Sequence, residues 1–366
     1  MRVLLVLLAS CRALPVHFDE VKPAFSDFAC AEGELRLAST GSTYATFSDA
    51  LADAAIEDYV CAGAGTFALG ESTACTGVHM DEGRRLSIVG AGSDRTVLVG
   101  SASSRADSCR DLAPAYYGEG SAVTLAGITL SDALVLIEAR SVELVDVVSR
   151  DVARSGVLAL HVEASKYTAK DVAVVDNRLD YLGFSFGGEG VLTDFVVARN
   201  TYGEGYLGYF RGAVSWEGGE VVDNARTLDM EPGGYDLLEH NGALTLRAVT
   251  FSGNRTNGPL LSGFGDLMAE RVIFADNDAT GSAVLRHHSY EDTTTAVSIN
   301  ESVFVRNVSP DAAVGLYDGA TLTLDDVDFG TGVDANGTCD VSVDGACAAE
   351  GLGPHADLAC DGDGCE

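Results

Sequence analysis

The segment YTAKDVAVVDN at residues 167–177 indicates the fold of the chain, because similar segments recur along it. Each copy has two short runs of alternating apolar residues, a turn residue between them, and a final Asn. The clearest other copies are VLTDFVVARN (191–200), SWEGGEVVDN (215–224), LTLRAVTFSGN (244–254), LMAERVIFADN (267–277) and VSINESVFVRN (297–307). A period of about two dozen residues is typical of a solenoid, in which each unit buries its apolar face against its neighbours.

The alternation has a period of two, which predicts strands with one buried face. The residue between the two runs is Gly or Asp in the first five copies, and these residues tolerate a left-handed backbone at a sharp corner. The turn positions are Gly127, Asp146, Asp171, Asp194, Gly218, Ala248, Arg271, Glu301 and Asp326. The closing asparagines are expected to stack into a structural ladder that satisfies buried turn backbone. They are Asn177, Asn200, Asn224, Asn254, Asn277 and Asn307.

These repeats resemble the right-handed parallel β-helix of the pectin-lyase-like superfamily, in particular its degenerate repeat proteins from the bacterial surface-protein branch. The segments TYATFSDALADAA (residues 43–55) and LSIVGAGSDRTVLVG (86–100) carry the resemblance upstream. The resemblance implies an all-β fold of about ten coils, with a capping helix at the N-terminal end. From the residues alone, 46–57 also reads as a helix, because Thr46 can cap it and Phe47 and Leu51 share a face.

The chain is therefore divided into four parts. Residues 1–10 are expected to be an export signal, 11–39 a tether, 40–332 the β-helix with its capping helix, and 333–366 a C-terminal cap rich in Cys, Asp and Gly.

The N-terminus and the cysteines predict export. An apolar run ends at Leu8-Ala9-Ser10-Cys11, which fits a bacterial lipobox in which Cys11 is lipidated; the alternative is a misplaced start codon. The other eight cysteines cluster at the two ends of the chain, which favours disulfides in an oxidising compartment over a zinc site. They are Cys30, Cys61, Cys75, Cys109, Cys339, Cys347, Cys360 and Cys365.

The charge limits the partners. Asp and Glu number 55 against 23 Lys and Arg, a formal net charge of −32. Such a field repels nucleic acid, anionic lipid and bare polyuronates, so nucleic acid is excluded and membrane contact is expected only through a lipid anchor.

Aromatic residues concentrate between residues 181 and 216, where exposed rings would suit stacking on sugars. The expected binding residues are Tyr202, Tyr206, Tyr209, Trp216 and Arg211. The alternative is that many of these rings fill the interior of the coils.

Two longer loops hold mixed carboxylates and imidazoles that could converge on one face and serve acid–base chemistry. One loop holds Asp229, Glu231, Asp236, Glu239 and His240, and the other holds Arg286, His287, His288, Tyr290, Glu291 and Asp292. The weak catalytic candidates are Asp229, Glu231, His287 and His288; the alternative is a solvated loop. The signature motifs of polygalacturonase-like hydrolases and pectate lyases are absent. In the tail, Asp361 and Asp363 suggest a weak Ca²⁺ site, with a Gly-rich turn inside a disulfide loop as the alternative.

The sequence thus predicts an exported cell-surface β-helix that binds carbohydrate or extracellular matrix without catalysis. The alternatives are a polysaccharide lyase or glycoside hydrolase acting along one face, and an adhesin-like stalk with no small ligand.

Overall fold

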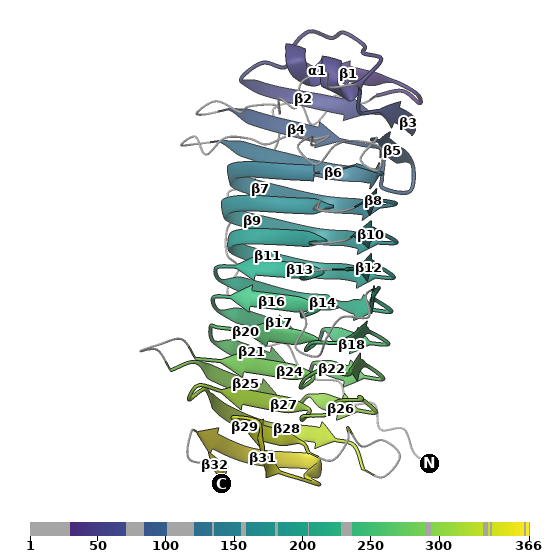
Figure 1. Ribbon diagram of the computed structural model, residues 1–366. Coiled ribbons are helices and arrows are strands. Elements are labelled where there is room, and N and C mark those ends of the chain that lie inside the picture. Colours follow the sequence, from purple (N-terminus) through teal and green to yellow (C-terminus); the bar gives the residue numbers. More distant parts are fainter. Residues whose placement is uncertain are drawn as a thin grey trace, which may run out of the picture.

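The computed structural model shows a tall stack of β-coils (Figure 1). It describes residues 30–70, 84–100, 121–133, 135–154, 159–179, 182–203, 205–227, 236–289, 294–331, 336, 339–361 and 364–365. Cys11, Cys75, Cys109, Asp229, Glu231 and Asp363 lie outside these residues. None of the helices in the described part is long and apolar enough to cross a membrane.

Each coil pairs in parallel with the next, so the fold is a parallel β-helix. In the first coils one long strand runs through most of the turn. These strands are β6 (Ala122–Ser131), β7 (Val135–Arg150), β9 (Leu160–Val175) and β11 (Phe184–Ala198). From residue 208 onward each coil begins with a separate short strand, and the strands of successive coils lie on three faces.

Face A consists of the first strand of each coil. Its strands are the first residues of β7, β9 and β11, then β13 (Gly208–Arg211), β16 (Leu238–Asn241), β20 (Leu261–Gly263), β24 (Leu285–His288), β27 (Val314–Tyr317) and β29 (Val341–Val343).

The next two faces follow around the coil. Face B holds β17 (Leu244–Arg247), β21 (Leu267–Glu270) and β25 (Ala296–Asn300), and face C holds β18 (Thr250–Ser252), β22 (Ile273–Ala275) and β26 (Val303–Val305). The strands β14 (Val214–Val222) and β28 (Thr321–Phe329) span both of these faces.

A separate sheet of two-residue strands runs along one edge of the stack. Its members are β8 (Ala153–Arg154), β10 (Arg178–Leu179), β12 (Thr201–Tyr202), β15 (Ala225–Arg226), β19 (Arg255–Thr256) and β23 (Asp278–Ala279).

The corners and the asparagine ladder form where the repeat predicts them. All of the aligned turn positions adopt a positive φ, from Glu301 at 47° to Gly218 at 72°. At the ladder, the Asn254 Oδ1 accepts hydrogen bonds from the backbone N and the Nδ2 of Asn224, at 3.1 and 2.9 Å. The same pattern runs from Asn177 through Asn307 and continues to Asn336, which the sequence analysis did not assign to the ladder.

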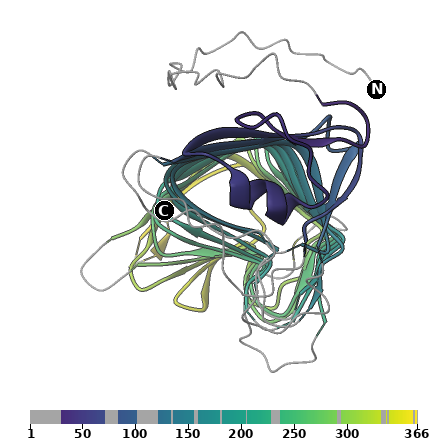
Figure 2. The ribbon, with the colours of Figure 1, turned by 90° about the horizontal axis from the view of Figure 1, so that it is seen from above.

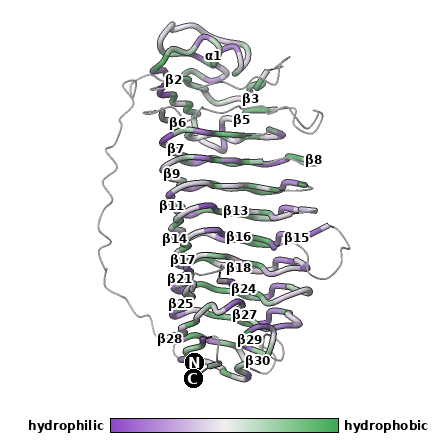
Figure 3. Tube along the Cα trace, turned by 60° about the vertical axis from the view of Figure 1, so that its left-hand side comes forward, coloured by the Kyte–Doolittle hydropathy of each residue, from purple (hydrophilic) through white to green (hydrophobic). Residues whose placement is uncertain are grey.

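The interior is filled by stacked apolar side chains, and Figure 3 shows hydrophobic and hydrophilic residues alternating along the coils. Phe251, Phe274, Phe304 and Phe329 form a column with ring centroids 4.7, 4.7 and 5.3 Å apart. Such a column requires each coil to keep the phase of the one before, so the strand register is strongly specified.

The helix α1 (Phe47–Asp53) lies across one end of the stack (Figure 2). Thr46 caps it by accepting a hydrogen bond from the backbone N of Asp49 at 3.2 Å. The predicted extension of the helix to residue 57 is wrong, because the backbone becomes extended at Ala54 and β2 (Glu57–Ala62) already begins at Glu57. Around the helix lie β1 (Leu35–Leu37), β3 (Gly65–Ala68), β4 (Arg85–Val89) and β5 (Thr96–Val99).

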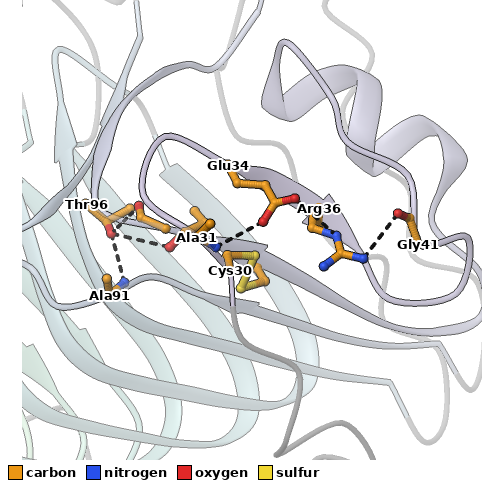
Figure 4. Close-up of a disulfide and its surroundings, with 10 residues drawn as sticks. Cys30, Ala31, Glu34, Arg36, Gly41, Ala91 and Thr96 are labelled. Atoms are coloured by element: carbon orange, nitrogen blue, oxygen red, sulfur yellow. Dashed lines mark hydrogen bonds and ion pairs between the residues drawn. A yellow bond between two sulfur atoms is a disulfide. The ribbon is translucent and has the colours of Figure 1, made fainter.

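The fold begins within the segment 11–39 that was expected to be a tether. β1 pairs antiparallel with β2, and a disulfide joins Cys30 to Cys61 (Figure 4). Beside it, the Thr96 hydroxyl donates to the backbone O of Gly63 at 3.0 Å and accepts from the backbone N of Ala91 at 2.8 Å (Figure 4).

At the other end, the sheet changes direction. β30 (Ala346–Ala349) pairs antiparallel with β29, and β31 (Gly353–Asp361) pairs antiparallel with β28 and with β32 (Gly364–Cys365). Disulfides join Cys339 to Cys347 and Cys360 to Cys365. Antiparallel pairing covers the open edge of β28, which would otherwise be available to other chains.

Candidate functional site

The outward surface of face A gathers aromatic and charged side chains from successive coils. One column of residues in register contains Tyr209, Glu239, Ser262 and Arg286. Because neighbouring strands lie about 4.8 Å apart, residues far apart in sequence become direct neighbours here. We call this surface, from Tyr206 to Tyr317, the face A site.

One end of the face A site is a pair of tyrosines. The rings of Tyr206 and Tyr209 stack with centroids 6.1 Å apart and an interplanar angle of 25°, and both side chains are partly exposed. The Tyr206 hydroxyl is hydrogen-bonded to Glu239. Burial is the main cause that raises the pKa of both groups, so this contact lies in a partly dry environment.

The other end is a stack of three rings. His288 lies between Phe264 and Tyr317, with centroid distances of 5.3 and 5.0 Å, and all three are partly exposed. The His288 Nδ1 is 3.1 Å from an Asp318 carboxylate oxygen. The Tyr317 hydroxyl donates to Asp311 at 2.6 Å, and burial raises the pKa of Tyr317 to about 12.

Between the two aromatic ends lies a buried carboxyl group. The Asp236 side chain is 5% exposed; it accepts a hydrogen bond from the Ser262 hydroxyl and lies 3.4 Å from Arg286 Nη2. Burial raises the pKa of Asp236 to about 6, against the lowering effects of Arg286 and Ser262. A carboxyl group that retains its proton near pH 6 can act as a proton donor.

Beside this site, a glycine in one coil allows side chains of the two flanking coils to contact each other. Arg211 forms an ion pair with Glu163, two coils away, across Gly187, which lies between them in the register. A Cβ on Gly187 would lie 2.3 Å from Glu163 Oε2. The absence of a side chain at Gly187 therefore permits this pair.

The structure divides the expected binding residues. Tyr206, Tyr209 and Arg211 point outward, but the expectation that Tyr202 and Trp216 are exposed is wrong, since both are 0% exposed. Trp216 shares the inward parity of Val214, and the Tyr202 hydroxyl bonds to Thr256 at 2.9 Å inside the coil. The parity of the strand could have revealed the position of Trp216.

The expected catalytic residues are also divided. His288 belongs to the face A site, whereas His287 is 0% exposed inside the coil and cannot meet an external ligand. In the strand LRHH, His287 has the parity of the inward Leu285. The placement of His287 in an exposed loop was therefore wrong. Asp229 and Glu231 lie outside the described residues.

The centre of the site was predicted only in part. Asp236, Glu239 and Arg286 were named among the mixed loop residues but were not chosen as catalytic candidates. Ser262, Phe264 and Tyr317 were missed, because their proximity to these residues depends on the register between coils.

For the tail, Asp361 is exposed on β31. Within the described residues, no group of three or more His, Cys, Asp or Glu side chains is placed to hold a metal ion. Ca²⁺ binding by Asp361 and Asp363 stays a prediction.

Comparisons with known proteins add little about function. No protein-family model matches the sequence, and no curated protein matches it. Among solved structures, the chain is similar to the A-module of the mannuronan C-5 epimerase AlgE4 from Azotobacter vinelandii. The identity is 15% and the TM-score 0.35, over 81% of this chain and 90% of that one. This likeness carries no argument about activity.

Proposed function

We propose that this chain is an exported β-helix protein that binds an extended polysaccharide along the face A site. The observation that carries the proposal is the arrangement of partly exposed rings at both ends of a polar centre on one strand ladder. Sugar rings have apolar faces and polar edges, which suit aromatic platforms flanking hydrogen-bonding groups. From Tyr209 to Tyr317 the site crosses four coil steps, about 19 Å at ~4.8 Å each.

The charges of the site indicate the kind of chain. Arg211 and Arg286 are both engaged by carboxylates, Glu163 and Asp236. The whole protein carries a net charge of −32, which repels acidic polymers. The proposed ligand is therefore a neutral polysaccharide of the cell surface or extracellular matrix.

The proposal includes the finer features that the repeats suggest. These are a right-handed helix of about ten coils related to the pectin-lyase-like superfamily, with caps at both ends. Three disulfides between described cysteines support an oxidising compartment. Export and a lipid anchor on Cys11 are part of the same proposal.

Replacing Tyr209 or Tyr317 with alanine is expected to weaken polysaccharide retention by about two- to tenfold each, since a lost ring contact is worth roughly 0.5–1.5 kcal/mol. Affinity electrophoresis against a panel of neutral and acidic polysaccharides measures this. The matched control is Met268→Ala, because Met268 is 43% exposed on face B, away from the site. Equal weakening by Met268→Ala would show that the polysaccharide binds outside the face A site. If the protein is retained on no polysaccharide, the adhesin-like stalk is favoured instead.

A second candidate function is cleavage of the bound chain, favoured by the buried Asp236 carboxyl with a pKa of about 6. In a hydrolysis, Asp236 would donate its proton to the leaving oxygen, water would add to the sugar carbon, and Glu239 would accept the proton from that water. The carboxyl groups of Asp236 and Glu239 both interact electrostatically with Arg286, so they lie in the same part of the site.

Hydrolysis predicts that product release falls as the pH rises above about 6, because Asp236 then loses its proton. Asp236→Asn is expected to abolish release while retention stays measurable. Glu220→Gln, an exposed carboxylate on β14, is the control and leaves release unchanged. Retention by the wild type without any product would reject this second function and leave the binding role intact.

A further inference from the structure

Two histidines lie inside the coil directly behind the face A site. His240 is 1% exposed and His287 0% exposed, and their ring centroids are 5.4 Å apart with an interplanar angle of 31°. Imidazoles are unusual in an interior that is otherwise filled by aliphatic and aromatic side chains.

A glycine makes room for this pair. The inward column of face A runs Phe210, His240, Gly263, His287, Leu316, with one residue from each coil. A Cβ on Gly263 would lie 1.9 Å from His240 Nε2, so the His240 ring occupies the space beside Gly263. The two imidazoles thus meet across a coil that carries no side chain between them.

The hydrogen bonds of the pair suit neutral rings. His240 Nδ1 donates to the backbone O of Gly242 at 2.8 Å, and its buried Nε2 has no hydrogen-bond partner. Both ring nitrogens of His287 are buried and meet no hydrogen-bond partner of good geometry. The nearby backbone of Gly265 raises the pKa of His287 slightly, but burial outweighs this effect. Burial is the main cause that lowers the pKa of His240 to about 4 and that of His287 to about 3.

Among the described strands packed against the pair, no charged side chain points into the coil. The inward neighbours on the adjoining strands of face A are Phe210, Gly263 and Leu316. The inward residues of face B are all apolar: Leu244, Leu246, Leu267, Ala269, Val297 and Ile299. The titratable groups of these face A strands point outward. They are Tyr209 and Arg211 on β13, Glu239 on β16, Arg286 and His288 on β24, and Tyr317 on β27. A proton on either ring would thus be buried without an acidic partner, and protons on both would repel across 5.4 Å.

We propose that the His240–His287 pair makes the coils of the face A site open in acid and release the bound polysaccharide. This inference rests on the proposed function, in which polysaccharide binds the face A site. Inward and outward residues alternate on the same strands, so the histidines and the site share a backbone. Glu239 precedes His240, and Arg286 precedes His287. Opening of β16 and β24 to admit protons therefore disrupts the centre of the site.

The sign follows from linkage. In an opened coil each imidazole binds a proton at a pKa of about 6.5, whereas the closed coil binds one only near the lowered values. The closed state is fully favoured above about pH 6.5 and loses stability as the pH falls below it.

Hydrogen exchange of the ligand-free protein tests the proposal. We expect the protection of amides in β16, β20 and β24, corrected for intrinsic exchange, to fall at least about a hundredfold between pH 7.5 and pH 4.5. The amides of β7 and β9 serve as the internal reference and keep their protection. The double variant His240→Leu and His287→Leu is expected to keep protection in all of these strands at pH 4.5, because leucine fits an apolar column and does not titrate.

His161→Leu is the matched control, because His161 lies on the outward side of β9 and its loss leaves the acid response unchanged. Unchanged protection of β16 and β24 in the wild type at pH 4.5 overturns the proposal, as does an equal loss in the double variant. If the double variant does not fold, His287→Leu alone provides a second test and is expected to reduce the loss of protection between pH 7.5 and pH 4.5, because one titrating ring of the pair then remains.

The exchange experiment contains no polysaccharide, so its outcome is independent of the binding function. Retention on a polysaccharide at pH 7.5 that is lost at pH 4.5 only in the wild type completes the proposal. If amide exchange responds to acid but the protein is retained on no polysaccharide, the proposed function is rejected. The His240–His287 pair would then affect only the stability of the coils.

Discussion

Asn254→Ala is expected to lower the free energy of unfolding by about 3–5 kcal/mol, because it interrupts the asparagine ladder at its centre. The Asn254 side chain accepts from the backbone N and the Nδ2 of Asn224, and its Nδ2 donates to the backbone O of Val221 at 2.7 Å. Alanine leaves these buried groups without partners, and each such loss costs about 1–3 kcal/mol, not fully additively. Urea unfolding followed by circular dichroism measures the change.

Asn241→Ala is the control for this prediction. Asn241 is exposed at the end of β16, so its replacement is expected to change the free energy of unfolding by less than about 0.5 kcal/mol. A similarly small effect of Asn254→Ala would show that water or a relaxed backbone replaces the ladder bonds.

Trp216→Ala is expected to destabilise the protein by about 3–5 kcal/mol, as typical for removal of a buried aromatic ring. Trp216 is fully buried and contacts Phe195, Phe210 and Phe251, with ring centroids 5.4, 6.0 and 6.3 Å away. The coils above and below are fixed by their own hydrogen bonds, so the resulting cavity cannot collapse fully. Thermal and urea unfolding measure the loss.

Tyr209→Ala separates packing from binding. Tyr209 is partly exposed, so its replacement is expected to weaken retention with little effect on unfolding, whereas Trp216→Ala lowers stability. The reverse pattern, with an unaltered unfolding transition in Trp216→Ala and a specific loss of binding, would contradict the inward position of this ring.

Much of the fold is readable from local pattern. The turn residue and the alternation on either side of it predicted the left-handed corners at Asp171 and Glu301, and the recurring Asn predicted the ladder. These features repeat because every coil must satisfy the same backbone groups and bury the same face. The helix boundary was less accurate, since the end of α1 depends on where β2 joins the sheet.

The site was harder to predict. Aromatic density alone does not say which side of a strand faces solvent, and Tyr209 and Trp216 differ only in parity. Asp236 becomes a neighbour of Arg286 through two coils of unequal length. Without the register between those coils, neither residue suggests the other.

Residues a few positions apart in the chain are enough to specify stacked β-coils with positive-φ corners and an asparagine ladder. The burial of Trp216 and His287 follows the parity of their strands. The burial of Tyr202, and the proximity of Tyr206, Glu239 and Tyr317 to the buried Asp236 carboxyl, depend instead on how the coils stack. The physical reason is that the side chains of the site meet across coils, at separations set by loop length and register.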